Sequence, residues 1–284
     1  MQLDNSAANA FRKCPLLYFE TYVQRLQRVT VEPSAMDYGT RVHTLLAEKN
    51  HILKGESDVQ LSPEYPHPGL EAEAQAMVAA YNSFYPVDPF DIVDVERTFQ
   101  VNLPCPLCKS CADCNCNVAD VPGVHTYCGK FDAIVRLHSS GKLAILEHKT
   151  ESRNSKMNTP EAWASRTQAQ LYIWAAQQVY NEPIKGVILN ILTRQSPKGQ
   201  VGCSFRRDDN LLYDQSKLDE AIADIVWVAD QIETCERLGF WPAFREACVS
   251  PTGWACDFRD PHLIGWTEEL KLVKFKEAEQ YLSL

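Results

Sequence analysis

The sequence predicts an α/β protein in which helices flank a central mixed β-sheet. Three observations support this prediction: helical spacing of apolar residues comes first, β-branched runs occupy the middle of the chain, and further helical patterns surround and follow these runs. The chain has 284 residues, of which 45% are hydrophobic and 23% charged, so it is long enough to bury a large core. We expect one domain over residues 1–284.

The first third of the chain is predicted to be mainly helical. Apolar spacing indicates a helix over residues 5–29, which Pro15 interrupts, and two more helices over 38–53 and 69–84. Residues 92–101 then alternate between apolar and polar side chains, which is typical of a half-buried strand. The predicted sheet therefore begins at about residue 92.

The middle of the chain contains a predicted β-hairpin. Two runs rich in β-branched and apolar residues, 128–135 and 143–150, flank the turn sequence Ser139-Ser140-Gly141. The elements expected after the hairpin are a helix over 159–180, strands over 186–193 and 200–206, and a helix over 211–238.

The charge and the apolar pattern limit the function classes. A formal net charge of −9 argues against a broad basic surface for nucleic acid, since non-specific affinity comes from neutralising phosphates. It does not exclude a metal-dependent nuclease, because the acidic ligands add to the count and only the local field of a cleft matters. The sequence contains neither a membrane-spanning apolar run nor a signal-peptide pattern. We expect a cytoplasmic protein of a bacterial or phage-infected cell, with no membrane partner.

The predicted hairpin contains a candidate catalytic group. Asp132 lies near the start of its first strand, and Glu147 and Lys149 lie near the end of its second strand. Side chains alternate along a strand, so Glu147 and Lys149 are expected on the same face. Two carboxylates and an amine form a minimal site for a hard divalent cation and an attacking water. A Glu-x-Lys pair by itself is more often a solvated cross-strand pair, so the wider pattern has to decide.

Five short motifs occur in a fixed order along the chain. They are Phe11-Arg12-Lys13-Cys14-Pro15, Gly39-Thr40-Arg41-Val42-His43, Gly129-Lys130-Phe131-Asp132, Glu147-His148-Lys149 and Gln168-Ala169-Gln170-Leu171-Tyr172. Each motif alone is short, but the ordered set resembles the RecB-like branch of the PD-(D/E)XK nuclease superfamily, which includes phage exonucleases. The resemblance covers nearly the whole chain and implies a restriction-endonuclease-like core.

The resemblance implies a role for each residue of the hairpin. Asp132 and Glu147 would be the main metal ligands, with the backbone carbonyl of His148 and the imidazole of His43 as further ligands. A nitrogen ligand favours Mn²⁺ over Mg²⁺. Lys149 would orient or deprotonate the attacking water, and a nearby metal ion would lower its pKa. Asp132, Glu147 and Lys149 are thus the candidate catalytic residues.

The implied function is that of a metal-dependent DNA exonuclease in recombination or DNA processing. Gln168 and Tyr172 are four residues apart, so they share a helix face, and by resemblance they would contact the DNA backbone. DNA ends or single strands are the expected substrate, and a recombination or replication protein is a possible protein partner. Two alternatives stay open, namely a non-catalytic DNA-binding scaffold that keeps the fold and a zinc-dependent binding module.

A cysteine-rich insertion over about 104–128 predicts a metal site. Eleven cysteines in a chain without a secretion signal favour metal ligation or buried thiols over disulfides. Cys-x-x-Cys turns suit tetrahedral zinc. We therefore expect a structural Zn²⁺ held by Cys105, Cys108, Cys111 and Cys114, and Cys116, His125 and Cys128 are alternative ligands that the spacing leaves open.

An iron–sulfur cluster is the less favoured interpretation of the other cysteines. In some relatives one N-terminal and three C-terminal cysteines hold such a cluster, and Cys14, Cys248 and Cys256 resemble three of these four. A cubane cluster usually needs four thiolates. Cys235 is the remaining candidate, but its helical context favours a buried small hydrophobic residue.

Overall fold

The computed structural model describes residues 1–28, 35–56, 68–104, 125–152, 159–195, 202–249, 256–268, 270–271 and 275–277. The chain divides into two compact units. Unit 1 comprises residues 1–31, 100–129 and 222–284, and unit 2 comprises residues 32–99 and 130–221. The expectation of a single domain with a cysteine-rich insertion stays a prediction.

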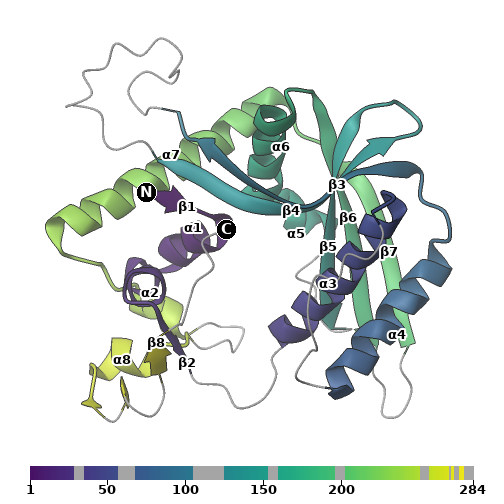
Figure 1. The fold of residues 1–284 in the computed structure, drawn as a ribbon. Coiled ribbons are helices and arrows are strands. Elements are labelled where there is room, and N and C mark those ends of the chain that lie inside the picture. The colour runs from purple at the N-terminus through teal and green to yellow at the C-terminus, as the bar shows by residue number, and fades with distance from the viewer. Residues whose placement is uncertain are drawn as a thin grey trace. The chain divides into compact units, whose positions relative to one another are not determined.

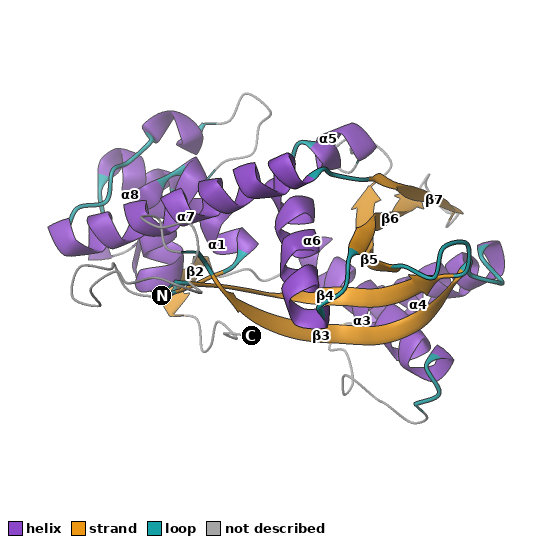
Figure 2. Ribbon diagram, turned by 90° about the horizontal axis from the view of Figure 1, so that it is seen from above, coloured by secondary structure: helices purple, strands orange, loops and turns teal. Residues whose placement is uncertain are grey.

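Unit 2 is built on a mixed β-sheet (Figures 1 and 2). Its strands are β3 (Phe90–Asn102), β4 (Thr126–Leu137), β5 (Leu143–Ser152), β6 (Ile184–Gln195) and β7 (Gly202–Leu211), of which β3 and β4 continue into unit 1. Strand β4 pairs with β3 and runs antiparallel to β5, β5 runs parallel to β6, and β6 runs antiparallel to β7. The prediction of an α/β protein with a central mixed sheet is confirmed.

Strands β4 and β5 form the predicted hairpin. Ala133 lies opposite Leu146, and Arg136 lies opposite Leu143. The turn closes with a hydrogen bond from the backbone N–H of Leu137 to the carbonyl of Lys142 (3.0 Å). Gly141 has a φ of +69°, a conformation that glycine adopts without steric cost.

Helices cover both faces of this sheet. They are α3 (Ala35–Leu53), α4 (Pro68–Phe84), α5 (Pro160–Ala164) and α6 (Thr167–Tyr180). His148 of β5 contacts Tyr81 of α4, whereas the next residue, Lys149, lies over the Trp163 ring of α5. Because successive side chains of a strand point to opposite faces, α4 and α5 lie on opposite sides of β5.

Apolar side chains of α3 and α4 form one core cluster with β6. It comprises Tyr38, Val42, Leu46, Ala74, Met77, Val78, Tyr81 and Leu192. A second cluster joins β3, β4, β5 and β6 through Phe90, Ala133, Val135, Leu137, Ala144, Leu146 and Ile188. Leu146, which lies opposite Ile188, and Leu192, which lies opposite Thr150, are on one face of the sheet. Because side chains alternate along a strand, both clusters therefore pack on the face of β5 that is opposite Glu147 and Lys149.

Unit 1 contains the two ends of the described chain. Its elements are β1 (Gln2–Leu3), α1 (Asn5–Lys13), α2 (Pro15–Tyr18), a π-helical turn (Phe19–Val23), β2 (Leu26–Arg28), most of α7 (Gln215–Leu238), a 3₁₀ turn (Arg245–Cys248), α8 (Arg259–Ile264) and β8 (Phe275–Glu277). Strand β1 runs parallel to β4, and β2 pairs antiparallel with β8. No helix among the described residues combines the length and the apolar character needed to cross a membrane.

The helix predicted over residues 5–29 is interrupted at Pro15, as predicted, but it ends before residue 29. Asp4 caps α1 by accepting a hydrogen bond from the backbone N–H of Ala7 (2.7 Å), but Cys14 is extended and ends the helix. A residue before proline avoids the helical region, and Pro15 then begins α2. The chain leaves the helical conformation at Arg25, which has a positive φ, and enters β2.

Two further helices begin or break where polar side chains bind the backbone. The helix predicted over 159–180 is interrupted between α5 and α6, where the Ser165 hydroxyl donates to the carbonyl of Ala162 (2.8 Å) and Arg166 is extended. The helix predicted over 211–238 starts only at Gln215, because Asp214 accepts a hydrogen bond from the N–H of Lys217 (3.0 Å) and so acts as its cap.

Candidate active site

Asp132 joins strand β4 to strand β5 and to helix α3. Its Oδ1 lies 3.2 Å from Nδ1 of His43, and its Oδ2 accepts a hydrogen bond from the backbone N–H of His148 (2.8 Å). The backbone pairing of the two strands includes Ala133 with Leu146, the residues adjacent to Asp132 and Glu147. The Asp132 carboxylate thus accepts a hydrogen bond from the backbone of β5 beside the paired residues of the two strands. This hydrogen bond fixes the orientation of the carboxylate.

Glu147 and Lys149 lie on the same face of β5, as predicted from the alternation of side chains along a strand. This face is the one that α5 covers. The Lys149 ammonium lies 2.6 Å from Oε1 of Glu147 and 5.2 Å from the centre of the buried Trp163 ring. The Gln168 amide donates to the same Oε1 at 3.5 Å. Oε2 of Glu147 is buried and has no hydrogen-bond partner among the described residues. One carboxylate oxygen of Glu147 is thus held by two donors, while the other has no hydrogen-bond partner among the described residues.

The pKa values of the two carboxyl groups are shifted in opposite directions. Burial alone would raise the pKa of Asp132, but the charge and hydrogen bond of His43 outweigh it and lower this pKa well below the usual range. Burial raises the pKa of Glu147 to about 7, because the Lys149 charge offsets burial only in part and Asp132 repels a second negative charge. Unequal carboxyl pKa values in one buried cluster are typical of functional sites.

The basic groups respond to the same neighbours. Burial disfavours the charged forms of His43 and Lys149, but Asp132 for His43 and Glu147 for Lys149 outweigh burial and raise both pKa values. A cation held by these carboxylates would act on Lys149 in the opposite direction. Burial lowers the pKa of His148 to about 3, so its imidazole is neutral.

A polar network behind β5 was not anticipated from the sequence. Asn190 of β6 donates to the Tyr81 hydroxyl (2.8 Å) and approaches Nδ1 of His148 (3.4 Å). Arg207 of β7 donates to Asn190 Oδ1 and to the Tyr81 hydroxyl, both at 2.8 Å, and pairs with Asp88 at 2.7 Å. Asn190 interrupts an apolar run in the sequence, and this interruption is a signal that would have indicated a buried polar group.

Gly39 allows α3 to approach β5 closely. A Cβ atom at this position would lie 2.9 Å from Oγ1 of Thr150, which is shorter than normal contacts allow. His43 follows Gly39 by four residues, so both lie on the same side of α3. The close approach brings the His43 imidazole to Asp132.

The structure brings together most of the residues predicted for the site. His43, Asp132, the His148 backbone, Glu147, Lys149 and Gln168 form one connected cluster. Among the described residues, the ligand atoms of His43, Asp132 and Glu147 do not all lie within 4.8 Å of one another. Tyr172 packs edge-on against Phe131 (5.5 Å) and Phe99 (5.7 Å), next to the strand that contains Asp132.

The predicted zinc ligands Cys105, Cys108, Cys111 and Cys114 lie outside the described residues. His125, which follows them, has its Nε2 atom 3.3 Å from a Glu233 carboxylate oxygen on α7. The cysteines considered for an iron–sulfur cluster, Cys14, Cys248 and Cys256, are all buried in unit 1. Cys235 lies half-buried on α7.

The donor set of the unit 2 cluster suits a hard cation. Carboxylate oxygens are the ligands that Mg²⁺ and Mn²⁺ prefer, and a buried oxygen without a partner, Oε2 of Glu147, is the kind of atom that such an ion satisfies. The cluster therefore has the chemistry of an acidic, cation-binding site at a strand pair of a mixed sheet.

An α/β fold with this acidic site defines the class of protein, and the sequence identifies the family. Residues 3–260 match the model of the PD-(D/E)XK nuclease superfamily, and the chain belongs to that superfamily. The predicted superfamily is thus confirmed. Its members typically use divalent metals such as Mg²⁺ or Mn²⁺, and membership makes DNA the expected substrate.

Two solved structures that are similar to this chain share little sequence with it. A crystal structure of a candidate exonuclease from Eubacterium rectale has 13% identity and a TM-score of 0.46, with 85% of this chain and 84% of that chain covered. The crystal structure of SSO0001 has 15% identity and a TM-score of 0.32, with 87% and 95% covered. Both scores are below 0.5, so family membership rests on the sequence match. No curated protein matches the chain significantly.

Proposed function

We propose that this protein is a divalent-metal-dependent DNA exonuclease of the RecB-like branch that hydrolyses phosphodiester bonds in recombination or DNA processing. One observation carries the proposal: Asp132, Glu147 and Lys149 lie in one cluster, in which the buried Glu147 keeps a carboxylate oxygen without a partner among the described residues. Exonuclease action and the recombination role rest on the ordered motifs that resemble this branch.

The metal ligands would be Asp132 and Glu147, with the His43 imidazole and the backbone carbonyl of His148 completing the set. A cation held there would stabilise negative charge on the phosphate oxygens and lower the pKa of a water molecule. Asp132 is already oriented by two contacts, so binding would need little rearrangement of this carboxylate.

Lys149 would act on the attacking water. Its ammonium is held between the Glu147 carboxylate and the Trp163 ring, so its position beside the acidic cluster is defined. Gln168 holds Oε1 of Glu147, and this contact leaves Oε2 for the cation. Gln168 and Tyr172 lie on one face of α6, and we propose that this face also contacts the DNA backbone.

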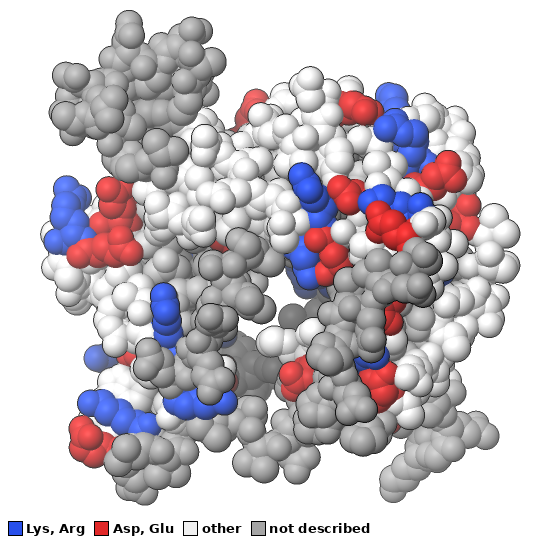
Figure 3. All heavy atoms as spheres, in the orientation of Figure 1, with Lys and Arg blue, Asp and Glu red and all other residues white. Residues whose placement is uncertain are grey.

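The charge pattern on the face shown in Figure 3 is compatible with a polyanionic substrate. On the face shown in Figure 3, acidic and basic side chains are interspersed. The net charge of −9 therefore does not form a continuous acidic surface on that face, and phosphate attraction would come from local groups.

A cleavage assay on matched DNA forms tests the proposal. Linear blunt, linear single-stranded, nicked circular and covalently closed circular DNA are incubated with the full chain, with and without Mg²⁺ or Mn²⁺. We expect metal-dependent release of short products from linear DNA and an intact closed circle. Cleavage of the closed circle would replace exonuclease by endonuclease action. Metal-dependent binding without any cleavage would favour the scaffold alternative.

A further inference from the structure

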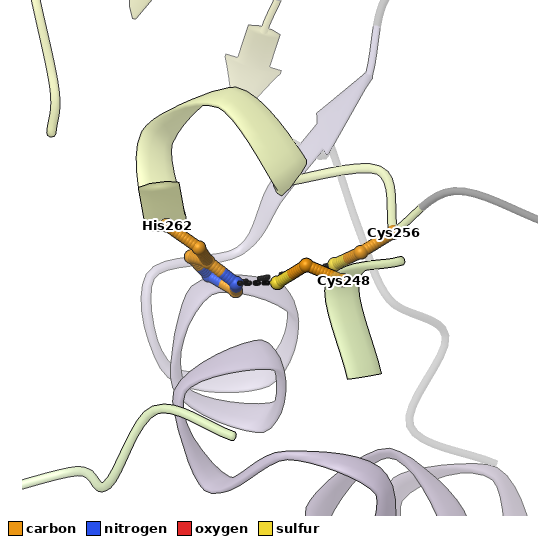
Figure 4. Close-up of side chains that lie close together, drawn as sticks. All are labelled: Cys248, Cys256 and His262. Atoms are coloured by element: carbon orange, nitrogen blue, oxygen red, sulfur yellow. Dashed lines mark hydrogen bonds between the residues drawn. The ribbon is translucent and has the colours of Figure 1, made fainter. Parts of the chain in front are cut away.

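In unit 1, Cys248, Cys256 and His262, which can all bind a metal ion, lie close together (Figure 4). They are distant in the sequence from the residues of the β4–β5 hairpin. Nδ1 of His262 lies 3.4 Å from Sγ of Cys248 and 3.9 Å from Sγ of Cys256. The three ligand atoms all lie within 4.8 Å of one another. The residues are 1%, 6% and 7% exposed for Cys248, Cys256 and His262, so water has little access to them.

The local backbone holds these side chains in place. Cys248 ends the 3₁₀ turn, and its carbonyl accepts a hydrogen bond from the N–H of Cys256 (3.4 Å). His262 lies on α8, and its backbone N–H donates a hydrogen bond to the carbonyl of Phe258 (2.9 Å). The imidazole also stacks on the Phe258 ring at 5.9 Å. These contacts turn Nδ1 toward the two thiols, as Figure 4 shows.

A purely apolar role does not account for the histidine. Cys248 and Cys256 pack with Phe258 and Phe275 in a hydrophobic cluster, as buried thiols often do. The imidazole is polar on both sides of its ring, and burying a polar atom without a partner costs free energy. Nε2 of His262 has no hydrogen-bond partner among the described residues, and Nδ1 faces only thiols, which are weak hydrogen-bonding groups.

The distances fit a tetrahedral zinc ion. With Zn–S of about 2.3 Å and Zn–N of about 2.0–2.1 Å, sulfur and nitrogen ligands of a tetrahedron lie about 3.6 Å apart. The two observed S–N separations, 3.4 and 3.9 Å, lie on either side of this value. Thiolates together with an imidazole select Zn²⁺ over the hard cations that suit the carboxylates of unit 2.

We propose that Cys248, Cys256 and His262 form a structural Zn²⁺ site. The ion ties the 3₁₀ turn to α8 across residues 249–261 and holds both against the cluster that Phe258 and Phe275 form beside the β2–β8 pair. Binding at such a site contributes to folding, because the unfolded chain does not hold the ligands together. This site is independent of the proposed nuclease activity and of the cysteine-rich insertion.

Metal analysis of the full chain tests the site. Zinc, iron and acid-labile sulfide are measured in the unmodified protein and in Cys256→Ser, His262→Ala and Cys235→Ser. We expect both site variants to contain about one zinc per chain less than the unmodified protein, whatever the insertion binds. The matched control Cys235→Ser, which changes a half-buried thiol outside the group, keeps the full content.

A ligand exchange keeps the test decisive if the first variants fold poorly. His262→Cys replaces nitrogen by sulfur, so it retains the zinc that His262→Ala loses, and its cobalt-substituted form gains sulfur-to-metal charge-transfer absorption over the unmodified protein. Equal metal content in all variants overturns the proposal, as does a Cys248–Cys256 disulfide. Iron with stoichiometric sulfide, lost in the site variants, also overturns it in favour of a cluster.

Discussion

The two faces of strand β5 differ in the kind of buried polar atom that has no hydrogen-bond partner among the described residues. On the face of Glu147 and Lys149, a buried carboxylate oxygen has no partner among the described residues. On the opposite face, Asn190, Tyr81 and Arg207 are joined by hydrogen bonds of 2.8 Å, and the atom without a partner is Nε2 of the neutral His148 imidazole. We infer that the face of Glu147 and Lys149 binds a ligand. The face with the network of Asn190, Tyr81 and Arg207, here called the paired face, stabilises the strand.

The largest expected effect comes from the carboxylates. Asp132→Asn or Glu147→Gln should lower DNA cleavage by about 1000-fold or more, because each change removes a metal ligand and transition-state charge stabilisation. Glu147→Gln should change the free energy of unfolding by about 1 kcal/mol or less, because burial already favours the neutral form of this side chain. Asp132→Asn should lower it by about 1–3 kcal/mol, because the charge pair with His43 is lost. Cleavage rates and denaturant unfolding measure the two effects.

Asp91→Asn is the matched control for these variants. Asp91 is an exposed carboxylate of unit 2 that contacts His138 at 3.0 Å. Its loss should leave the cleavage rate unchanged. Near-normal activity of either site variant in Mg²⁺ or Mn²⁺ would refute the ligand assignment.

Loss of the Lys149 amine should separate catalysis from metal binding. Lys149→Met should reduce turnover by about 100-fold or more, which is the usual contribution of a group that positions or deprotonates water. Calorimetric titration should still detect Mn²⁺, because the amine is not a ligand. Lys142→Met, in the exposed hairpin turn, should behave like the unmodified protein. Lost Mn²⁺ binding in Lys149→Met would assign the lysine a structural role.

The paired face should respond in stability. Arg207→Met leaves Asp88 with only the more distant Lys49 (3.8 Å), removes one of the two donors to the Tyr81 hydroxyl and removes the donor to Asn190 Oδ1. These losses should lower the free energy of unfolding by about 2 kcal/mol or more. Folded variant protein should keep cleavage within about tenfold. Arg206→Met, which changes an exposed arginine of β7 whose charge acts on Glu161, should lower the free energy of unfolding by about 1 kcal/mol or less. A stable but inactive Arg207→Met protein would contradict the division between the faces.

The smallest effect is expected at His43. His43→Asn should lower cleavage by about tenfold or less and reduce the preference for Mn²⁺ over Mg²⁺, since a nitrogen ligand favours the former. His51→Asn on the same helix, whose imidazole lies 2.6 Å from Glu56, is the control. Rates measured across both metals decide the matter, and an unchanged Mn²⁺-to-Mg²⁺ ratio would argue against His43 as a ligand.

The sequence predicted the parts of the site that depend on local periodicity. Glu147 and Lys149 share a face because strands alternate, and the hairpin turn brings Asp132 to them. The contact of His43 with Asp132 joins residues 89 positions apart, so only the resemblance to a family could suggest it. The partners of Asn190 come from α4 and β7, and no local pattern relates these elements.

The same limit applies to the second candidate site. Cys248 and Cys256 attracted attention as cysteines, but their observed companion is a histidine on α8. The cysteine pattern alone could not indicate His262, because zinc binds imidazole as well as thiolate ligands. Helix ends were mispredicted where capping by Asp214 and Ser165 outweighed apolar spacing.

The near-contact of Gly39 with Thr150 has an evolutionary consequence. A methyl group at position 39 would require the Thr150 side chain to rotate or α3 to withdraw, and withdrawal would carry the imidazole of His43 away from Asp132. Positions 39 and 150 therefore constrain each other's size, although they lie in different elements. Related chains in which the glycine is replaced should carry a compensating smaller side chain at position 150 if they keep the histidine.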